Sequence, residues 1–168
     1  MRHPGRAMRH PTPGEPESPA EAITAAGHDL AMALRAAYLT MHRRANAEFA
    51  RFGLTADQFV ILTALAEGDE VTQKELARRT ASDANTMSEM LGRLEQRGLI
   101  ARERDADDGR ARRVSLTASG REVQRRAWDG IATFCGTLAG LMPSDELRHL
   151  VVQLRRIAGV MTDAGGNA

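Results

Sequence analysis

The stretch of sequence that decides the fold is residues 82–117, SDANTMSEMLGRLEQRGLIARERDADDGRARRVSLT. Its first half places apolar residues three and four positions apart, which predicts an amphipathic helix with one buried face. Those apolar residues are Met87, Met90, Leu91 and Leu94. Either Ser82 or Asp83 can cap the start of this helix, and Gly98 is expected to end it.

The second half of the stretch changes from helical to extended periodicity. Residues 99–104 and 112–116 are short runs with strand character, and the second alternates clearly. The turn-forming residues DADDGRA separate them, so we expect a β-hairpin. A pair of short helices followed by such a hairpin makes a winged helix-turn-helix. In that architecture the second helix enters the DNA major groove, and the hairpin tip can reach the neighbouring minor groove.

The chain on both sides of this stretch is predicted to be helical. A helix of about seven residues is entered from Thr72, and an earlier one is capped by Thr55. A long amphipathic helix spans residues 21–51. After the hairpin, Thr117 caps a fifth long helix that continues to Pro143, and a sixth helix follows it.

The predicted fold is mainly α with a small β-hairpin wing. We expect residues 53–117 to form the winged helix-turn-helix domain, and residues 21–52 and 118–162 to form dimerisation helices. Residues 1–20 hold five of the six prolines and are expected to be a disordered tail. The terminal helices carry apolar stripes that the small winged domain cannot cover. Burial against a second copy would cover them, and a symmetric homodimer predicts a palindromic operator.

The composition is that of an ordinary globular protein. The chain has 168 residues, of which 42% are hydrophobic and 27% charged. It lacks a run of about 20 apolar residues, so we expect no membrane segment and a cytoplasmic location. Cys135 is the only cysteine and is expected to lie buried in the core. Because we find no catalytic motif or metal-ligand cluster, we expect no enzyme activity, cofactor or metal site.

Several motifs occur together at fixed spacings between residues 53 and 120. They are Arg93-Leu94-Glu95, Gly98-Leu99-Ile100, Asp108-x-Arg110 and Leu116-Thr117. On these motifs the chain resembles the core of the MarR family of bacterial transcription regulators. The resemblance implies a winged-helix fold, dimerisation through the terminal helices, and a typical role as a ligand-responsive repressor.

The residues expected to contact double-stranded DNA lie on three elements. At the hairpin tip, the Arg110 guanidinium can reach a narrow minor groove, while Asp108 can pair with an arginine and hold the tip in shape. Arg112 and Arg113 face opposite sides of a strand, so at most one, taken as Arg112, contacts phosphate. Other expected contacts are Lys74 and Arg78 on the preceding helix, and Ser82, Asn85, Thr86, Glu89 and Arg93 on the recognition helix.

Glu89 departs from similar family members, which often carry a basic or small residue at this position. A carboxylate facing DNA repels phosphate unless it accepts a hydrogen bond from cytosine or pairs with a cation. Arg93 lies four residues further along the helix, and we favour this intrahelical pair over the cytosine contact.

The resemblance also implies a small-molecule effector, bound where the dimerisation helices meet the winged domain. An arginine or histidine beside apolar groups would suit an aromatic carboxylate or a phenol. The candidates are Arg35, Tyr38, Met41, His42 and Trp128. Two alternatives remain open at this point: a winged-helix module for protein interaction, which Glu89 favours, and a redox or metal sensor.

Overall fold

The computed structural model describes residues 18–68, 70–104 and 112–165. The chain divides into two units, Met1–Arg43 and Arg44–Ala168. The described part of the first unit is helical: α1 (Pro19–Phe49) begins there, and its last residues belong to the second unit. No single helix in the described part is long and apolar enough to cross a membrane. One bent pair of helices in that part has the length and composition for it, α1 with the 3-10 turn η1 (Ala50–Phe52) together with α2 (Ala56–Ala66), and this pair is bent by 73°.

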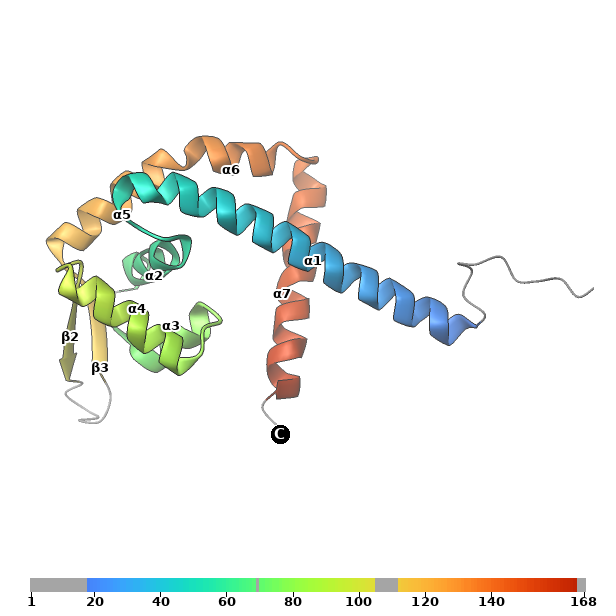
Figure 1. The fold of residues 1–168 in the computed structure, drawn as a ribbon, viewed down its shortest axis with the longest axis horizontal. Coiled ribbons are helices and arrows are strands. Elements are labelled where there is room, and N and C mark those ends of the chain that lie inside the picture. Colours follow the sequence, from blue (N-terminus) through green and yellow to red (C-terminus); the bar gives the residue numbers. More distant parts are fainter. Residues whose placement is uncertain (1–17, 69, 105–111, 166–168) are drawn as a thin grey trace, which may run out of the picture. The chain divides into compact units, whose positions relative to one another are not determined.

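The second unit contains the remaining elements (Figure 1). After α1 come a 3-10 turn η1 (Ala50–Phe52), α2 (Ala56–Ala66), β1 (Val71–Thr72), α3 (Gln73–Arg79), α4 (Ala84–Gln96), β2 (Ile100–Arg104), β3 (Arg112–Leu116), α5 (Ala118–Gly130), α6 (Ala132–Ala139) and α7 (Ser144–Gly165). The order of helices and hairpin is that of a winged helix-turn-helix, so the predicted fold class is confirmed.

Local capping sets the helix starts in this unit. The Thr55 hydroxyl accepts from the Gln58 N–H at 3.1 Å, and the Gln58 side chain accepts from the Thr55 N–H at 3.2 Å, a reciprocal capping box. Thr72 caps α3, as predicted. Of the two candidates for α4, Asp83 is the cap, because its carboxylate accepts from the first N–H groups of that helix.

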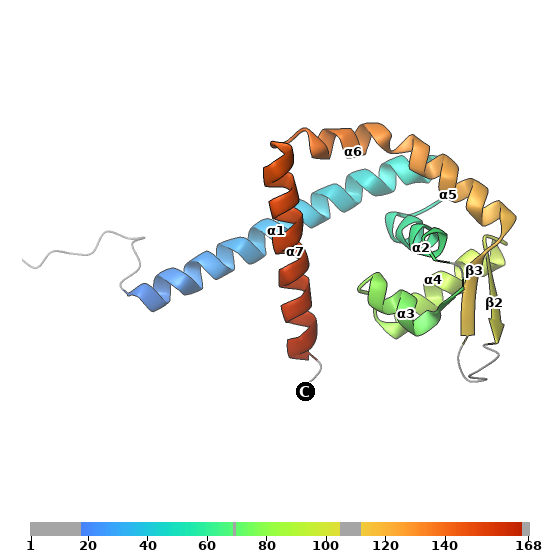
Figure 2. The ribbon, with the colours of Figure 1, turned by 180° about the vertical axis from the view of Figure 1, so that it is seen from behind.

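The small sheet has three antiparallel strands in the order β1-β3-β2. Figure 2 shows the hairpin strands β2 and β3 side by side. The hairpin strands β2 and β3 pair from Ile100 opposite Leu116 to Arg104 opposite Arg112. The sequence predicted these two strands and missed β1, which pairs Val71 with Val114. Two residues are too short for a strand period to be recognised, so only tertiary pairing reveals β1.

One core joins α2, α3, α4 and the sheet. Its largest fully buried side chains, each under 2% exposed, are Ile61, Leu62, Leu65, Leu76, Met87, Leu91, Leu94 and Val114. The buried side of α4 is therefore part of the domain interior, and the orientation of this helix is fixed by packing.

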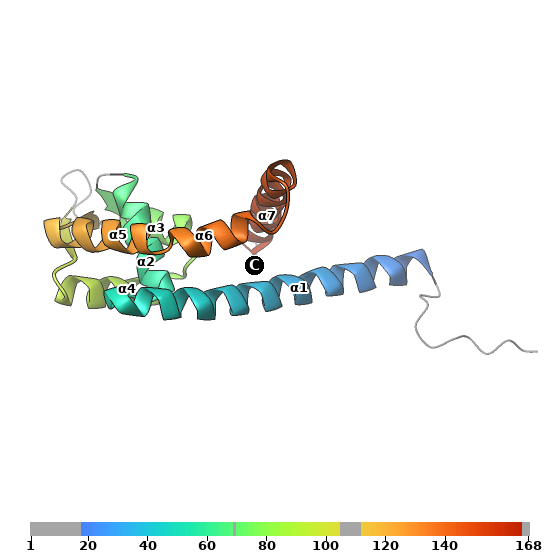
Figure 3. The same cartoon turned by 90° about the horizontal axis from the view of Figure 1, so that it is seen from above.

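The fifth helix was predicted as one continuous element, and this prediction was wrong. The chain breaks between α5 and α6 at Ile131, where φ is −97° and ψ is 4°. Figure 3 shows α5 and α6 following one another along the chain. At Gly130 the Phe52 ring lies against the backbone, with one ring carbon 2.8 Å from where a Cβ would be. Because glycine lowers helix propensity and admits this close approach, the break occurs beside it.

Cys135 was predicted to be buried, and the structure places it on an exposed face of α6. No residue of α6 is fully buried, and Phe134 is only partly covered by the core. The single chain therefore gives α6 too little packing to enclose the thiol.

The last helix, α7, leaves much apolar surface uncovered in the single chain. Its exposed apolar side chains include Leu150, Val151, Val152, Leu154, Val160 and Met161. Exposed apolar surface of this kind is typical of a helix that meets a partner.

Candidate nucleic-acid interface

The helix α4 has one buried and one exposed face. Met87, Leu91 and Leu94 are each 0% exposed, and they pack the buried face of the helix into the core of the domain. On the opposite side, five exposed side chains form what we call the outward face of α4, and the half-buried Ser82 lies just before the Asp83 cap of this helix. The five are Asn85, Thr86, Ser88, Glu89 and Arg93. Sequence reasoning did not single out Ser88, although it lies three positions after Asn85.

Asp83 organises the start of the outward face. Its Oδ1 accepts from the N–H of Asn85 at 3.0 Å and of Thr86 at 2.9 Å. The Thr86 hydroxyl donates to Oδ2 at 2.6 Å, and these bonds, led by that hydroxyl, lower the pKa of Asp83. Because the Thr86 proton is used inside the cap, that hydroxyl can only accept from a ligand. The Asn85 side chain is exposed one position before it.

Glu89 and Arg93 form the pair that the sequence favoured. Arg93 Nη2 lies 3.7 Å from Glu89 Oε1, and the two side chains are 66% and 74% exposed. At this distance and exposure the attraction is weak, about 0.3–0.5 kcal/mol for an i,i+4 pair. A stronger partner could therefore draw either side chain away.

On α3, one carboxylate binds two arginines. Arg78 donates to both Glu75 oxygens at 2.8 and 2.7 Å, and Arg79 Nε donates to Oε1 at 2.8 Å. The hydrogen bonds from Arg78, then from Arg79, lower the pKa of Glu75 to about 2. Glu75 therefore stays ionised above that pH and offsets part of the charge that Arg78 presents. Lys74, on the same helix, is exposed.

The wing strands carry a second charged cluster. Arg102, 17% exposed, donates to Glu95 Oε2 through Nε at 2.8 Å and also through Nη2. Arg102, with a smaller contribution from Arg112, lowers the pKa of Glu95. Arg112 is exposed, whereas Arg113 is half-buried with Nη1 3.7 Å from Glu70 Oε2.

The two predicted residues of the wing tip, Asp108 and Arg110, lie outside the described residues. The predicted effector residues on α1 are described within the first unit. There the rings of Tyr38 and His42 lie 5.3 Å apart, and Arg35 and Met41 are exposed. In the second unit, Trp128 is 56% exposed, with its ring 6.3 Å from that of Phe59.

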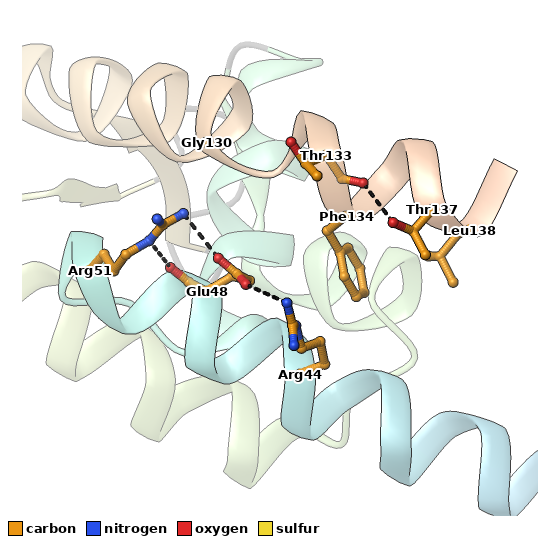
Figure 4. Close-up of a pocket in the computed structure, with 8 residues that line it drawn as sticks. All are labelled: Arg44, Glu48, Arg51, Gly130, Thr133, Phe134, Thr137 and Leu138. Atoms are coloured by element: carbon orange, nitrogen blue, oxygen red, sulfur yellow. Dashed lines mark hydrogen bonds and ion pairs between the residues drawn. The ribbon is translucent and has the colours of Figure 1, made fainter. Parts of the chain in front are cut away.

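The second unit contains a cleft of about 570 Å³ between the end of α1 and the break between α5 and α6 (Figure 4). It is lined by Arg44, Glu48, Arg51, Gly130, Thr133, Phe134, Thr137 and Leu138. Glu48 pairs with Arg44 at 3.3 Å and with Arg51 at 3.0 Å, so the three groups together carry one net positive charge. None of the five predicted effector residues lines this cleft, because it depends on a helix break that the sequence did not reveal.

In the described ranges 18–68, 70–104 and 112–165, no three His, Cys, Asp or Glu side chains are grouped so that they could hold a metal ion. The arrangement instead presents a polar helix face beside several arginines, which suits contact with bases and phosphates.

Comparison with known sequences agrees with this geometry. The sequence model of the MarR family matches residues 52–111. Transcriptional regulator HosA of Escherichia coli O157:H7 is 41% identical over 107 residues, which are 61% of this chain and 76% of that protein. The organic hydroperoxide resistance transcriptional regulator of Bacillus subtilis (strain 168) is 32% identical over 102 residues, covering 60% of this chain and 67% of that one.

Solved structures with the same fold include two with more than 25% identity. The transcriptional repressor CouR, bound to a 23-mer DNA duplex, has a TM-score of 0.71 and 32% identity, covering 77% of this chain and 92% of that chain. The PcaV transcriptional regulator from Streptomyces coelicolor, in complex with its natural ligand, has a TM-score of 0.66 and 27% identity. That match covers 85% of this chain and 93% of that one.

Proposed function

Because the chain belongs to the MarR family of DNA-binding transcriptional regulators, which are not enzymes, we propose that it is a dimeric repressor released from a palindromic operator by a small ligand. The observation that carries this proposal is the outward face of α4. It is polar and exposed, and three fully buried side chains hold it in place. A rigid helix with a polar exposed face is what the major groove admits.

The proposed contacts follow from the chemistry of each exposed group. Asn85 can read an adenine with two hydrogen bonds, and Ser82 can donate to phosphates or bind base edges. Thr86, whose proton is bound to Asp83, can accept from a donor at a base edge. Arg93, Arg112, Lys74 and Arg78 are proposed to contact phosphates, with Arg110 in the minor groove and Asp108 supporting the wing tip. The DNA duplex in the CouR structure supports the same use of this fold.

The homodimer is proposed from the uncovered apolar surface. Leu150, Val151 and Leu154 are 40%, 37% and 38% exposed in the single chain, on a helix that also carries charged residues. Burying such side chains against a second copy is favourable by about 25 cal/mol per Å². Two copies related by a twofold axis present two α4 helices to equivalent half-sites, which makes the operator palindromic.

The effector is proposed to be a small aromatic or phenolic acid. The cleft beside α6 supports this class, because Arg44 and Arg51 supply more positive charge than Glu48 offsets, and the Phe134 ring supplies an apolar wall. Its volume lies within the range of about 300–1,000 Å³ that is usual for small-ligand sites. The residues Arg35, Tyr38, Met41, His42 and Trp128 stay candidates for the same role. The structure of PcaV in complex with its natural ligand supports the proposal that a small ligand regulates this chain.

The proposal is tested by selecting bound duplexes from a random pool with the purified full chain. We expect one palindromic sequence to be enriched, and light scattering of its complex to give two chains per duplex. We also expect an aromatic carboxylate such as 4-hydroxybenzoate, used as a probe at millimolar concentration, to weaken this complex. Enrichment of no sequence would instead favour a winged-helix module for protein interaction, and a stable monomer at micromolar concentration would contradict the palindrome.

Replacing Glu89 with Gln is expected to strengthen DNA binding by about two- to fivefold at 0.1 M salt, on every duplex alike. The change removes a negative charge near phosphates and frees Arg93 toward the DNA backbone. The measurement is fluorescence anisotropy on the selected operator and on single-substituted operators, all at one salt concentration.

The matched control is Glu122→Gln, which removes the same charge and a similar intrahelical pair, with Arg125 at 2.9 Å, from α5. This control should leave affinity unchanged. A loss of affinity by Glu89→Gln that is confined to the native operator would show that Glu89 accepts from a cytosine, and would reject the pairing interpretation.

A further inference from the structure

The end of α4 is joined to a distant turn through one side chain. Arg97 follows the last residue of α4, and its Nη1 donates to the Gly53 carbonyl at 2.6 Å, across 44 positions of sequence. Gly53 forms the turn between η1 and α2. The exposed guanidinium therefore connects the recognition helix to the point where α1 ends and α2 begins.

The absence of a side chain at Gly53 leaves space for the Arg97 guanidinium beside the Gly53 carbonyl. Gly53 has φ +67°, in the left-handed region, and a Cβ there would lie 3.1 Å from Arg97 Nη2. Its carbonyl follows the C-terminal end of a helix, where carbonyl groups lack helical partners and positive charge is favourable. Glycine at this position thus provides both the turn and the space for the guanidinium.

Two other hydrogen bonds connect the elements around Arg97 and Gly53, and both are made by short side chains. The Asn46 side chain on α1 accepts from the Ala56 N–H of α2 at 2.8 Å, and the Thr117 hydroxyl at the start of α5 donates to the Gly98 carbonyl at 2.7 Å. These bonds join α1 to α2 and α5 to the end of α4. Arg97 adds the link from the end of α4 to the junction of α1 and α2.

We infer that Arg97 is a positioning residue for operator recognition, which fixes the end of α4 to the α1–α2 turn and so sets the half-site spacing that the dimer accepts. This inference rests on the proposed function, in which α1 is proposed to be a dimerisation helix, so that the separation of the two α4 helices depends on their connection to it. A looser connection lets each α4 shift independently, so that the dimer tolerates other spacings while each half-site is still read.

A direct phosphate contact by Arg97 has different consequences. Loss of such a contact weakens binding to specific and non-specific DNA alike, and lowers the slope of log K against log salt concentration by about 0.9. Loss of positioning leaves that slope and the non-specific affinity unchanged. The two roles are therefore separable in one set of titrations.

The experiment compares the wild-type chain with Arg97→Ala on three duplexes: the selected operator and versions whose spacer is one base pair shorter or longer. We expect Arg97→Ala to bind the native operator about five- to tenfold more weakly, consistent with loss of a charge-assisted hydrogen bond. We also expect its preference for the native spacer to fall by a similar factor, at an unchanged salt slope. Arg97→Lys, which keeps a positively charged donor, should restore part of that preference.

The matched control is Arg125→Ala, since Arg125 is an exposed arginine whose ion pairs lie within α5. It should leave all three affinities unchanged. Thermal unfolding is measured for each variant, and Arg97→Gln takes the place of Arg97→Ala if the alanine variant does not fold. An equal loss on all duplexes with a smaller salt slope, or an unchanged spacer preference, would overturn the inference. If the wild-type chain enriches no duplex, the proposed function itself fails.

Discussion

Replacing Leu91 with Ala is expected to lower the free energy of unfolding by about 2–5 kcal/mol. Leu91 is 0% exposed and lies on the buried face of α4, between Met87 and Leu94. Removing three side-chain carbons there leaves a cavity that the surrounding core can fill only in part. Domains of this size are stable by about 5–15 kcal/mol, so the loss is a large fraction of the total.

Urea denaturation followed by circular dichroism measures this effect. Leu91→Met, which nearly conserves volume, is the control and should cost less than about 1.5 kcal/mol. A change below 1 kcal/mol in Leu91→Ala would mean that the core under α4 is not packed as described.

The second large effect is expected from Gly120→Ala on α5, which should destabilise the fold by about 3 kcal/mol. A Cβ at this position would overlap the Leu99 carbonyl, with the carbonyl carbon only 2.9 Å away. That carbonyl also accepts from the Thr117 N–H at 3.1 Å. Since the obstructing atoms belong to the backbone, α5 must move away from the hairpin to make room.

The control for this prediction is Gly92→Ala on α4, where a Cβ would meet nothing within 4 Å. Alanine favours a helix over glycine by about 1 kcal/mol, so this variant should be as stable as the wild type or more stable. Both variants are compared by thermal unfolding. Equal midpoints for Gly120→Ala and the wild type would contradict the close approach of α5 to Leu99.

The parts of the fold that were predicted from sequence are those that local chemistry determines. Thr55 and Thr72 cap the starts of α2 and α3, and Gly98 adopts the left-handed conformation after the end of α4, because each role needs only neighbouring residues. The break at Ile131 was missed because it accompanies the contact of Gly130 with Phe52, far away in sequence. Cys135 was misplaced for the same reason, since its exposure depends on how little packs against α6.

In the candidate site, too, contacts within one helix were predicted from the sequence, whereas contacts between elements were not. The pair of Glu89 with Arg93 follows from helix spacing and was anticipated. The bond of Arg97 to the Gly53 carbonyl and the contact of Arg102 with Glu95 connect different elements, and no periodicity indicates them. Sequence patterns thus located the exposed face of α4, whereas the contacts that orient this helix needed the three-dimensional structure.

The separation of the two faces of α4 has an evolutionary consequence. The residues that keep the helix folded, such as Asp83 in the cap and Leu91 in the core, are not those exposed at Asn85, Ser88 and Glu89. Mutations at the exposed positions therefore change little in folding stability, where surface substitutions usually stay within about 0.5 kcal/mol. After gene duplication, a descendant copy can acquire a new target by drift at a few surface codons, while selection on its interior continues undisturbed.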